Sequence, residues 1–501
     1  MEYILSSFVF LMQPVNLLTI LLAAVAGMIL GAIPGLSGGL GITLMLPVTF
    51  AMEPKLAIAM LTSIWIGGVT GSFIAAVLVG IPGSGSSIPT CFDGYPMTKN
   101  GQAVKALGIG IIASFMGTFF STLIAVWLTQ MIANLALKMG PWEYFSLCFF
   151  AIMLVVSLSK GNMFRGLASA FIGILLACVG TSPLDGSFRF TFGSSNLIGG
   201  LSLVGVMMGL FAVEQVVVAH GKGQKDMPEV DLKHIRGLGV SLQEMKEHVK
   251  TIVRGFLIGL WIGFLPGMGS SLAAMVSYGA AKSASKTPEK FGTGYSDGVW
   301  ASEVANNAGI GGAIIPLIAL GIPGDGTAAL LLAALMIQGL SPGPLLLTSN
   351  PDIAYIIFAA TLLAAVLCLF VQFGTIRLFP RLLKLPYHYL FSVILTMCFI
   401  GAYTDSNNVF NIYIMVALAL LGILAEWGGL PSAPMLLGFI LEPMVEQNFR
   451  KAVTYSDHGG YAEFFTRPAS CLILVLTFVS LLWPVVKAYF QKKRLSKEAK
   501  A

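Results

Sequence analysis

The chain has 501 residues, of which 56% are apolar and only 10% are charged. Soluble domains carry about 25% charged residues, so this composition excludes an ordinary soluble protein and predicts an integral membrane protein. The formal net charge of +6 comes largely from basic residues close to the C-terminus. No aromatic residues interleave them as a base-stacking surface would require, so we expect no nucleic-acid partner.

Uncharged runs longer than the roughly 18 residues needed to cross a bilayer recur along the chain. They predict an all-α polytopic membrane protein with about 10–14 membrane segments, some of them half-length hairpins. The first residues lack the basic start of a cleaved secretory signal, so we expect the first segment to be retained. Most tryptophans are expected to anchor the chain at the membrane interface, namely Trp65, Trp142, Trp261, Trp300, Trp427 and Trp483.

One long polar stretch divides the membrane region in two. We expect a first membrane half at 1–219, a polar linker at 220–250, a second membrane half at 251–486 and a basic tail at 487–501. In the linker, Ser241 is followed three residues later by Glu244, a capping-box pattern that predicts a short surface helix. The positive-inside rule places the basic tail in the cytoplasm, where it meets anionic lipid.

Two short motifs occur once in each half. A GxxPG motif at 31–35 recurs at 263–267, an offset of 232 residues, and a GIPG motif at 80–83 recurs at 321–324, an offset of 241. The same motifs in the same order predict an internal duplication, which is common in secondary transporters. The alternative is a chance match between glycine-rich helices. Of parallel and inverted repeats, we favour inverted ones.

Four proline–glycine interruptions thus fall within the most apolar parts of the chain, at Pro34, Pro82, Pro266 and Pro323. Proline removes a helix donor, and the flanking glycines admit conformations that stop a helix. Irregular backbone survives at membrane depth only where it is buried in protein or lines a watery cavity. We therefore predict re-entrant hairpins and broken helices whose ends face a binding site, with surface loops as the alternative.

Small polar residues follow each interruption. Helix N-termini favour negative charge, and hydroxyl groups both donate and accept hydrogen bonds, so these residues suit a carboxylate ligand or a partly dehydrated cation. The alternative role is to cap the half-helices. The residues are Ser37, Ser84, Ser86, Ser87, Thr90, Ser270, Ser271, Asp325 and Thr327.

A carboxylate and two amides precede the second GIPG motif. Glu303, Asn306 and Asn307 are spaced i, i+3 and i+4, which places them on one face of a helix. A carboxylate inside an apolar span is costly, so Glu303 is a candidate for a functional site. The alternative is a structural role at the membrane edge.

Other chemistry finds little support. The five histidines avoid the long apolar runs, so an intramembrane serine hydrolase lacks its base. No Walker loop is present, and the six cysteines are scattered without zinc or disulfide spacing. We expect no enzyme, no catalytic residue, no metal site and no cofactor.

Four stretches resemble the large membrane subunit of the tripartite tricarboxylate transporters, the TctA family. They are GAIPGLSGGLGITLMLPVTF from Gly31, GIPGSGSSIPTCFDGYPMTKNGQA from Gly80, GFLPGMGSSLAAMVSYGAAK from Gly263, and GYSDGVWASEVANNAGIGGAIIPLIALGIPGDGTAALLLAALMIQGLSPGP from Gly294. The resemblance spans nearly the whole chain. Its most specific part is the ExANNA run followed by LGIPG.

The resemblance implies an elevator-type carrier in the bacterial inner membrane that imports di- or tricarboxylates such as citrate. It also implies two partners, a small TctB-like membrane subunit and a periplasmic TctC-like solute-binding protein, and coupling to an ion gradient. We favour Na⁺ over H⁺, because the sequence offers hydroxyls and carbonyls without an evident buried proton relay. Moving elements that carry the motifs would slide against scaffold helices, which we place at 142–219 and 353–429.

The motifs and the resemblance together define the predicted site. The predicted substrate-binding residues are Ser37, Gly38, Gly83, Ser84, Gly85, Ser86, Ser87, Ser270, Ser271, Asn306, Asn307, Gly324, Asp325, Gly326 and Thr327. The predicted ion-binding residues are Gly35, Ser37, Gly267, Ser270, Glu303, Asn306 and Asp325. A channel, a single-component secondary transporter and, less favoured, a membrane-embedded enzyme are the alternatives.

Overall fold

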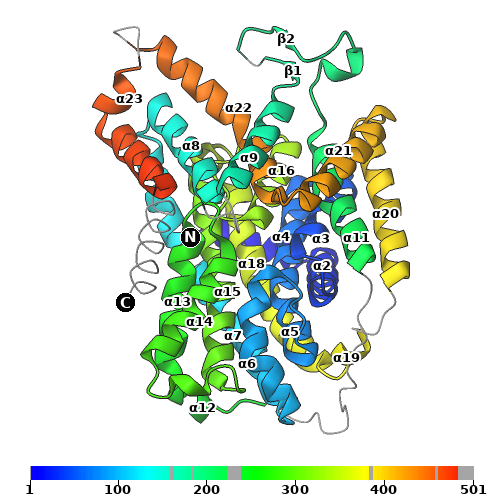
Figure 1. Cartoon of the computed structure of the whole chain (residues 1–501), viewed down its shortest axis with the longest axis vertical. Helices are drawn as coiled ribbons and strands as arrows, with labels where there is room; N and C mark the ends of the chain where they lie inside the picture. The colour runs from blue at the N-terminus through cyan, green and yellow to red at the C-terminus, as the bar shows by residue number, and fades with distance from the viewer. Residues whose placement is uncertain are drawn as a thin grey trace, which may run out of the picture. The chain divides into compact units, whose positions relative to one another are not determined.

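A computed structural model describes residues 2–157, 163–182, 184–222, 239–382, 387–456 and 461–482. These residues are almost entirely helical (Figure 1). Within them the only sheet is an antiparallel pair of short strands, β1 (Gly180–Thr181) and β2 (Phe188–Arg189), with Gly180 opposite Arg189. The prediction of an all-α polytopic membrane protein is therefore confirmed.

Seven helical stretches in the described part of the chain are long and apolar enough to span a membrane. They are Pro14–Ala32, Pro54–Val79, Ala103–Ala136, Leu203–Gly221, Ser296–Leu320, Pro351–Thr375 and Phe410–Trp427. Further apolar helices have only 10–17 residues, among them Gly38–Thr49 and Gly326–Ile337, which follow predicted interruptions. Half-length apolar helices thus occur where the motifs predict them.

The chain forms two compact units. The first comprises Met1–Ala136 and Leu203–Ile423. Its elements up to the first boundary are α1 (Glu2–Leu11), α2 (Pro14–Ala32), α3 (Gly38–Thr49), α4 (Pro54–Gly71), α5 (Phe73–Val79), the 3₁₀ turn η1 (Gly85–Ser87), α6 (Ile88–Lys99) and α7 (Ala103–Ala136). It continues with α10 (Leu203–Met207), the π-helical turn η3 (Met208–Val213), α11 (Glu214–Lys222), α12 (Leu242–Glu247), α13 (Val249–Phe264), α14 (Gly269–Ala284), η4 (Pro288–Lys290), α15 (Ser296–Leu320), α16 (Gly326–Ile337), α17 (Pro344–Ser349), α18 (Pro351–Thr375), α19 (Phe379–Leu382), α20 (Tyr387–Thr404) and most of α21 (Phe410–Trp427).

The second unit comprises Leu137–Ser202 and Leu424–Ala501. Its elements are α8 (Pro141–Ser157), α9 (Met163–Ala177), β1, β2, η2 (Ser195–Leu197), α22 (Ser432–Thr454), α23 (Glu463–Thr466) and a last apolar helix, Pro468–Leu482. Helix α22 packs against both α8 and α9. Each unit therefore combines segments from both predicted halves of the chain, and the predicted scaffold is divided, because 203–219 and 353–423 belong to the first unit.

Each predicted interruption ends one helix and precedes another. Helices α5 and α15 end at Gly80 and Gly321, whose φ angles of 70° and 72° lie in the left-handed region that glycine tolerates. Helices α2 and α13 end before Gly35 and Gly267, which also have positive φ. We name these four breaks turn 1 (33–37), turn 2 (80–84), turn 3 (265–268) and turn 4 (321–325).

The helices before these turns pack in the same way in both halves. A Cβ atom added to Gly31 of α2 would lie 2.0 Å from the carbonyl oxygen of Gly68 on α4. A Cβ atom on Gly263 of α13 would lie 2.3 Å from the carbonyl oxygen of Gly309 on α15. Gly263 follows Gly31 by the motif offset of 232, and Gly309 follows Gly68 by the motif offset of 241. Two more contacts recur at these offsets: Gly27–Ile64 with Gly259–Ala305, and Gly71–Met28 with Gly312–Leu260. The inverted relation of the halves stays a prediction.

Outside the turns, the predicted cap of the linker helix is present, whereas the role predicted for two tryptophans is corrected. In the linker, Ser241 Oγ accepts a hydrogen bond from the Glu244 backbone N–H at the start of α12, as the capping pattern predicts. The interface role was wrong for Trp65 and Trp300, because both side chains are fully buried against neighbouring helices. Trp483 and the basic tail at 487–501 lie outside the described residues, as does the linker from 223 to 238.

Candidate functional site

The four turns and the helix starts that follow them lie together in the first unit. At the start of α3, a Cβ on Gly39 would lie 3.6 Å from Thr327 Oγ1, just after turn 4. At the start of α14, a Cβ on Gly269 would lie 2.9 Å from the Asp325 Cβ atom. The structure therefore joins turns 1, 3 and 4.

Turn 2 joins the same cluster through η1. A Cβ on Gly85 would lie 3.1 Å from Ser271 Oγ, in the first turn of α14. The backbone of Gly83 also approaches the carbonyl oxygen of Gly31 in α2. The helices α3, α6, α14 and α16 thus begin at one place, which we call the turn cluster. Four helix N-termini bring the positive ends of their dipoles to this place, an arrangement that favours an anion.

Asp325 ties two of the turns together. Its Oδ1 atom accepts a hydrogen bond of 2.7 Å from the Ala328 backbone N–H and thereby caps α16. The backbone N–H groups of Thr327 and of Ser270 also donate to this carboxylate. Because these donors hold the Asp325 carboxylate, its first role is to fix turn 4 against α14.

The serine hydroxyls of the turn cluster differ in whether they have a hydrogen-bond partner. Between turn 2 and η1, the Ser84 and Ser86 hydroxyls are 2.9 Å apart. Ser87 Oγ donates to the Ser84 carbonyl oxygen and accepts from the Ser84 backbone N–H. In turn 1 Ser37 Oγ accepts from the Leu40 N–H. By contrast, Ser270 Oγ is buried and has no hydrogen-bond partner within the described chain. Such an atom is costly unless something else binds it.

Glu303 lies in a second polar cluster, inside the helices. Its carboxylate is fully buried on α15 and bonds to Thr90 of α6. The Asn306 and Asn307 amides lie 3.3 Å and 3.4 Å from its Oε2 atom. Asn307 also bonds to Ser114 of α7 and accepts from Thr118. We call this group the Glu303 cluster, and Figure 1 shows α6, α7 and α15 side by side.

The two clusters are connected along α15. A Cβ on Gly309 would lie 3.0 Å from Ser270 Oγ, the unsatisfied hydroxyl of the turn cluster. Asn306 lies one turn earlier, and its buried Oδ1 atom has no hydrogen-bond partner among the residues described. Two buried polar atoms without a partner in the described chain, Asn306 Oδ1 on α15 and Ser270 Oγ beside Gly309, therefore belong to the region between the clusters.

A further buried carboxylate, on Asp93 of α6, anchors a loop. Its Oδ1 atom accepts from the backbone N–H groups of Gly292, Gly294 and Tyr295 at 2.8–3.0 Å, and its Oδ2 atom accepts from the Tyr278 hydroxyl at 2.9 Å. These four donors satisfy both oxygens of the buried carboxyl group. Asp93 thus fastens α6, just after turn 2, to the loop between α14 and α15.

Most of these residues are predicted from the sequence, but several of their hydrogen-bond partners are not. Ser114, Thr118 and Ser302 complete the Glu303 cluster, and Gln215 of α11 accepts from Ser37. In the sequence, Ser114 and Thr118 are one helical turn apart in an apolar helix, together with Ser121 and Thr122. This polar stripe was the available signal.

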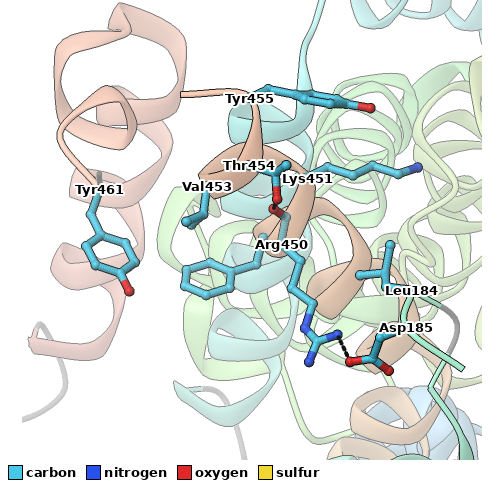
Figure 2. Close-up of a pocket in the computed structure, with 9 residues that line it drawn as sticks. Leu184, Asp185, Arg450, Lys451, Val453, Thr454, Tyr455 and Tyr461 are labelled. Carbon is cyan, nitrogen blue, oxygen red and sulfur yellow. Dashed lines mark hydrogen bonds and ion pairs between the residues drawn. The ribbon is translucent and has the colours of Figure 1, made fainter. Parts of the chain in front are cut away.

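The second unit contains a cavity of about 520 Å³. Its lining residues are Leu184, Asp185, Phe449, Arg450, Lys451, Val453, Thr454, Tyr455 and Tyr461. Figure 2 shows the ion pair across it, in which Arg450 donates to Asp185 at 3.1 Å. None of the predicted site residues lines this cavity, so it is separate from the turn cluster.

Comparison with known proteins identifies the family. A model described as the tripartite tricarboxylate transporter TctA family matches residues 17–437. An Agrobacterium vitis protein described as an uncharacterized 52.8 kDa protein in the TAR-I ttuC′ 3′ region is 34% identical over 465 residues, covering 93% of this chain and 92% of that protein. Another A. vitis protein, from the TAR-II ttuC′ 3′ region, is 35% identical over 235 residues, which is 47% of this chain and 97% of its own length. No solved structure matches. The chain is therefore a multi-pass membrane protein that belongs to the TctA family of tripartite tricarboxylate transporters.

Proposed function

We propose that this chain is the permease subunit of a secondary transporter that imports organic carboxylates of the di- and tricarboxylate class. It works in the bacterial inner membrane with its C-terminal tail in the cytoplasm. Its partners are a small TctB-like membrane subunit and a periplasmic TctC-like protein that delivers the substrate. An ion gradient drives uptake, and the protein catalyses no covalent reaction.

The convergence of four helix N-termini at the turn cluster is the observation that carries this proposal. Helices α3, α6, α14 and α16 each have at least 12 residues, so each adds a full helix dipole. Backbone N–H groups, the Ser86 hydroxyl and the unsatisfied Ser270 hydroxyl would bind the carboxylate groups of the substrate. No Lys or Arg belongs to the turn cluster, so these dipoles are its source of positive potential.

Alternating access is proposed to follow an elevator mechanism. The turn cluster joins elements from both halves, so it would move as one body that carries the substrate. The recurring glycine contacts of α2 with α4 and of α13 with α15 support this, because they hold each half rigidly. Close helix contacts between small residues leave no room for the halves to bend separately.

Reconstitution tests the proposal. The chain would be placed in liposomes with its small subunit and its binding protein, and uptake of a panel of labelled organic acids measured under imposed Na⁺ or H⁺ gradients. We expect gradient-driven uptake of a di- or tricarboxylate that depends on the binding protein. We also expect counterflow, the exchange of labelled for unlabelled substrate. Uptake without counterflow would indicate a channel, and uptake without the binding protein a single-component carrier.

A further inference from the structure

The cavity of the second unit lies beside the first turns of two apolar helices. Helix α8 and the helix Pro468–Leu482 begin side by side, where the Arg467 guanidinium lies 3.8 Å from the centre of a Trp142 ring. Phe449 and Val453, which line the cavity, pack against the buried cluster that contains Trp142. The ends of apolar helices in a multi-pass membrane protein lie at a membrane surface, where arginine and aromatic residues are common. This placement puts the cavity at the level of the lipid headgroups.

The cavity has one positive charge that no ion pair within the described chain balances. Arg450 donates to Asp185 at 3.1 Å, and its Nε atom lies 3.3 Å from Glu446. Glu446 is also bound by both Nη atoms of Arg189. The neighbouring Lys451 makes no ion pair or hydrogen bond with a described residue, and Figure 2 shows its side chain extending away from the pair of Arg450 and Asp185. Three cations and two anions thus favour a ligand with a single negative charge.

The rest of the lining combines hydroxyl groups with an aromatic wall. Tyr455 and Tyr461 are exposed, and their hydroxyl groups can donate to the oxygen of an anion. The rings of Tyr461 and Phe449 stack with their centres 6.1 Å apart. The volume of about 520 Å³ lies within the range of small-molecule sites. A ligand that matches this lining has a charged head and an apolar body.

The elements that flank the cavity expose apolar side chains. Phe188, Phe190 and Phe192 are all exposed, and the last two have φ angles of 51° and 48°, a left-handed conformation that residues with a side chain rarely adopt. The helix that follows Arg467 exposes further apolar residues, namely Leu472, Val475, Leu476, Phe478, Val479 and Leu482. These side chains are costly to expose to water but not to acyl chains. They favour a lipid over a water-soluble anion as the occupant of the cavity.

We propose that this cavity binds the headgroup of an anionic phospholipid that carries one negative charge, such as phosphatidylglycerol. Lys451 and Arg450 bind the phosphate oxygens, and the tyrosine hydroxyls donate to them. The acyl chains lie along the exposed apolar side chains. A di- or tricarboxylate brings more negative charge than this lining balances, so the proposed substrate does not fit here. The inference requires only that the chain resides in a membrane, and it is independent of the proposed transport.

Lipid titration of the purified full chain in detergent tests the site, with native mass spectrometry to count the lipids that stay bound. We expect phosphatidylglycerol to bind more tightly than phosphatidylethanolamine, whose headgroup has no net charge. Lys451→Glu reverses the unbalanced charge and should weaken the binding of phosphatidylglycerol about ten-fold. Asp185→Asn should strengthen it, because Arg450 then has one carboxylate partner fewer. Lys138→Glu is the matched control, since Lys138 is exposed in the same unit but does not line the cavity, and it should leave the affinity unchanged.

Three soluble competitors separate the lipid from other anions, namely inorganic phosphate, the lipid-free headgroup glycerophosphoglycerol, and citrate. We expect none of them to displace phosphatidylglycerol, because they lack acyl chains. Displacement by phosphate or by the free headgroup would identify a site for soluble phosphates, and displacement by citrate a site for organic acids. Either result overturns the lipid proposal. It is also overturned if both phospholipids bind equally, if Lys451→Glu binds like wild type, or if Lys138→Glu loses binding to the same extent.

Discussion

Turns 2 and 4 share one backbone but differ in their polar groups. Gly80 and Gly321 have nearly the same φ angle, and Gly83 and Gly324 approach the carbonyl oxygens of Gly31 and Gly263, which correspond in the two halves. Yet a pair of serines, Ser84 and Ser87, caps the 3₁₀ turn η1 after turn 2, whereas a carboxylate caps the helix α16 after turn 4. The packing is common to both halves, and the side chains at the helix starts are not.

The anchoring of the two turns differs as well. Asp93 ties α6 to the loop between α14 and α15 (285–295), whose counterpart between α3 and α4 comprises only 50–53. The corresponding position in α16 is Ala334, which cannot make such a bond. Similar backbone with different side chains would make the proposed site asymmetric, which suits the proposed binding of an organic anion together with a driving ion.

Breaking the shared packing should have the largest effect. In Gly263→Val the new side chain would overlap the backbone of α15, because even a Cβ lies 2.3 Å from the Gly309 oxygen. We expect about 3 kcal/mol of destabilisation or more, and no monodisperse protein on size-exclusion chromatography. Gly31→Val should behave in the same way if the halves are equivalent. Gly279→Val is the matched control, since a Cβ there meets nothing within 4 Å.

Removing the polar groups should abolish transport while the fold survives. Asn306→Ala, Asn307→Ala and Ser86→Ala each leave the helix packing in place, and each removes a hydrogen-bonding group from one of the two clusters. We expect loss of binding-protein-dependent uptake in liposomes at normal expression levels. Ser84→Ala is made alongside Ser86→Ala, because it removes the other hydroxyl of this hydrogen-bonded pair. Normal uptake in all three variants would exclude these residues from the site.

A structural feature could be predicted from the sequence where neighbouring residues cause it, and not where contacts between distant segments cause it. Proline and glycine act on their own backbone, so the four breaks were predicted to within a few residues. The grouping of the polar residues on α15 followed from helical spacing. Their partners Thr90, Ser114 and Thr118 come from other helices, and no local pattern pairs them with Glu303.

The division into units shows the same limit. Residues 137–202 pack with residues after 424, although more than 200 residues separate them in sequence. Composition treats both stretches as ordinary membrane helices. The full burial of Trp65 and Trp300 likewise depends on which helices surround them, and the general preference of tryptophan for the membrane interface did not reveal it.

Removing the side chains that cap the helix starts should lower the stability of the protein moderately, and by different amounts at turns 2 and 4. Asp325→Ala removes the acceptor for the Ala328 N–H and the bond from α14, so we expect a loss of about 1–2 kcal/mol. Asp325→Asn keeps an acceptor and should lose less. Ser87→Ala should cost about 1 kcal/mol, because it removes only two local bonds to the backbone of Ser84. Thermal unfolding in detergent measures all three, and equal losses would mean that Asp325 is merely a cap.

The smallest effect is expected in the second unit, outside both turns. Arg189 donates through its two Nη atoms to the two carboxylate oxygens of Glu446, at 2.8 Å and 3.0 Å. Glu446→Gln keeps the shape but removes the charge, and the side chains are 25% and 15% exposed, so we expect a loss of about 1 kcal/mol or less. Transport should keep its substrate preference and its dependence on the ion gradient, because this pair belongs to the second unit and all the predicted site residues belong to the first. A change in either property would show that the second unit takes part in substrate recognition. The difference between turns 2 and 4 would then not be the only source of substrate specificity.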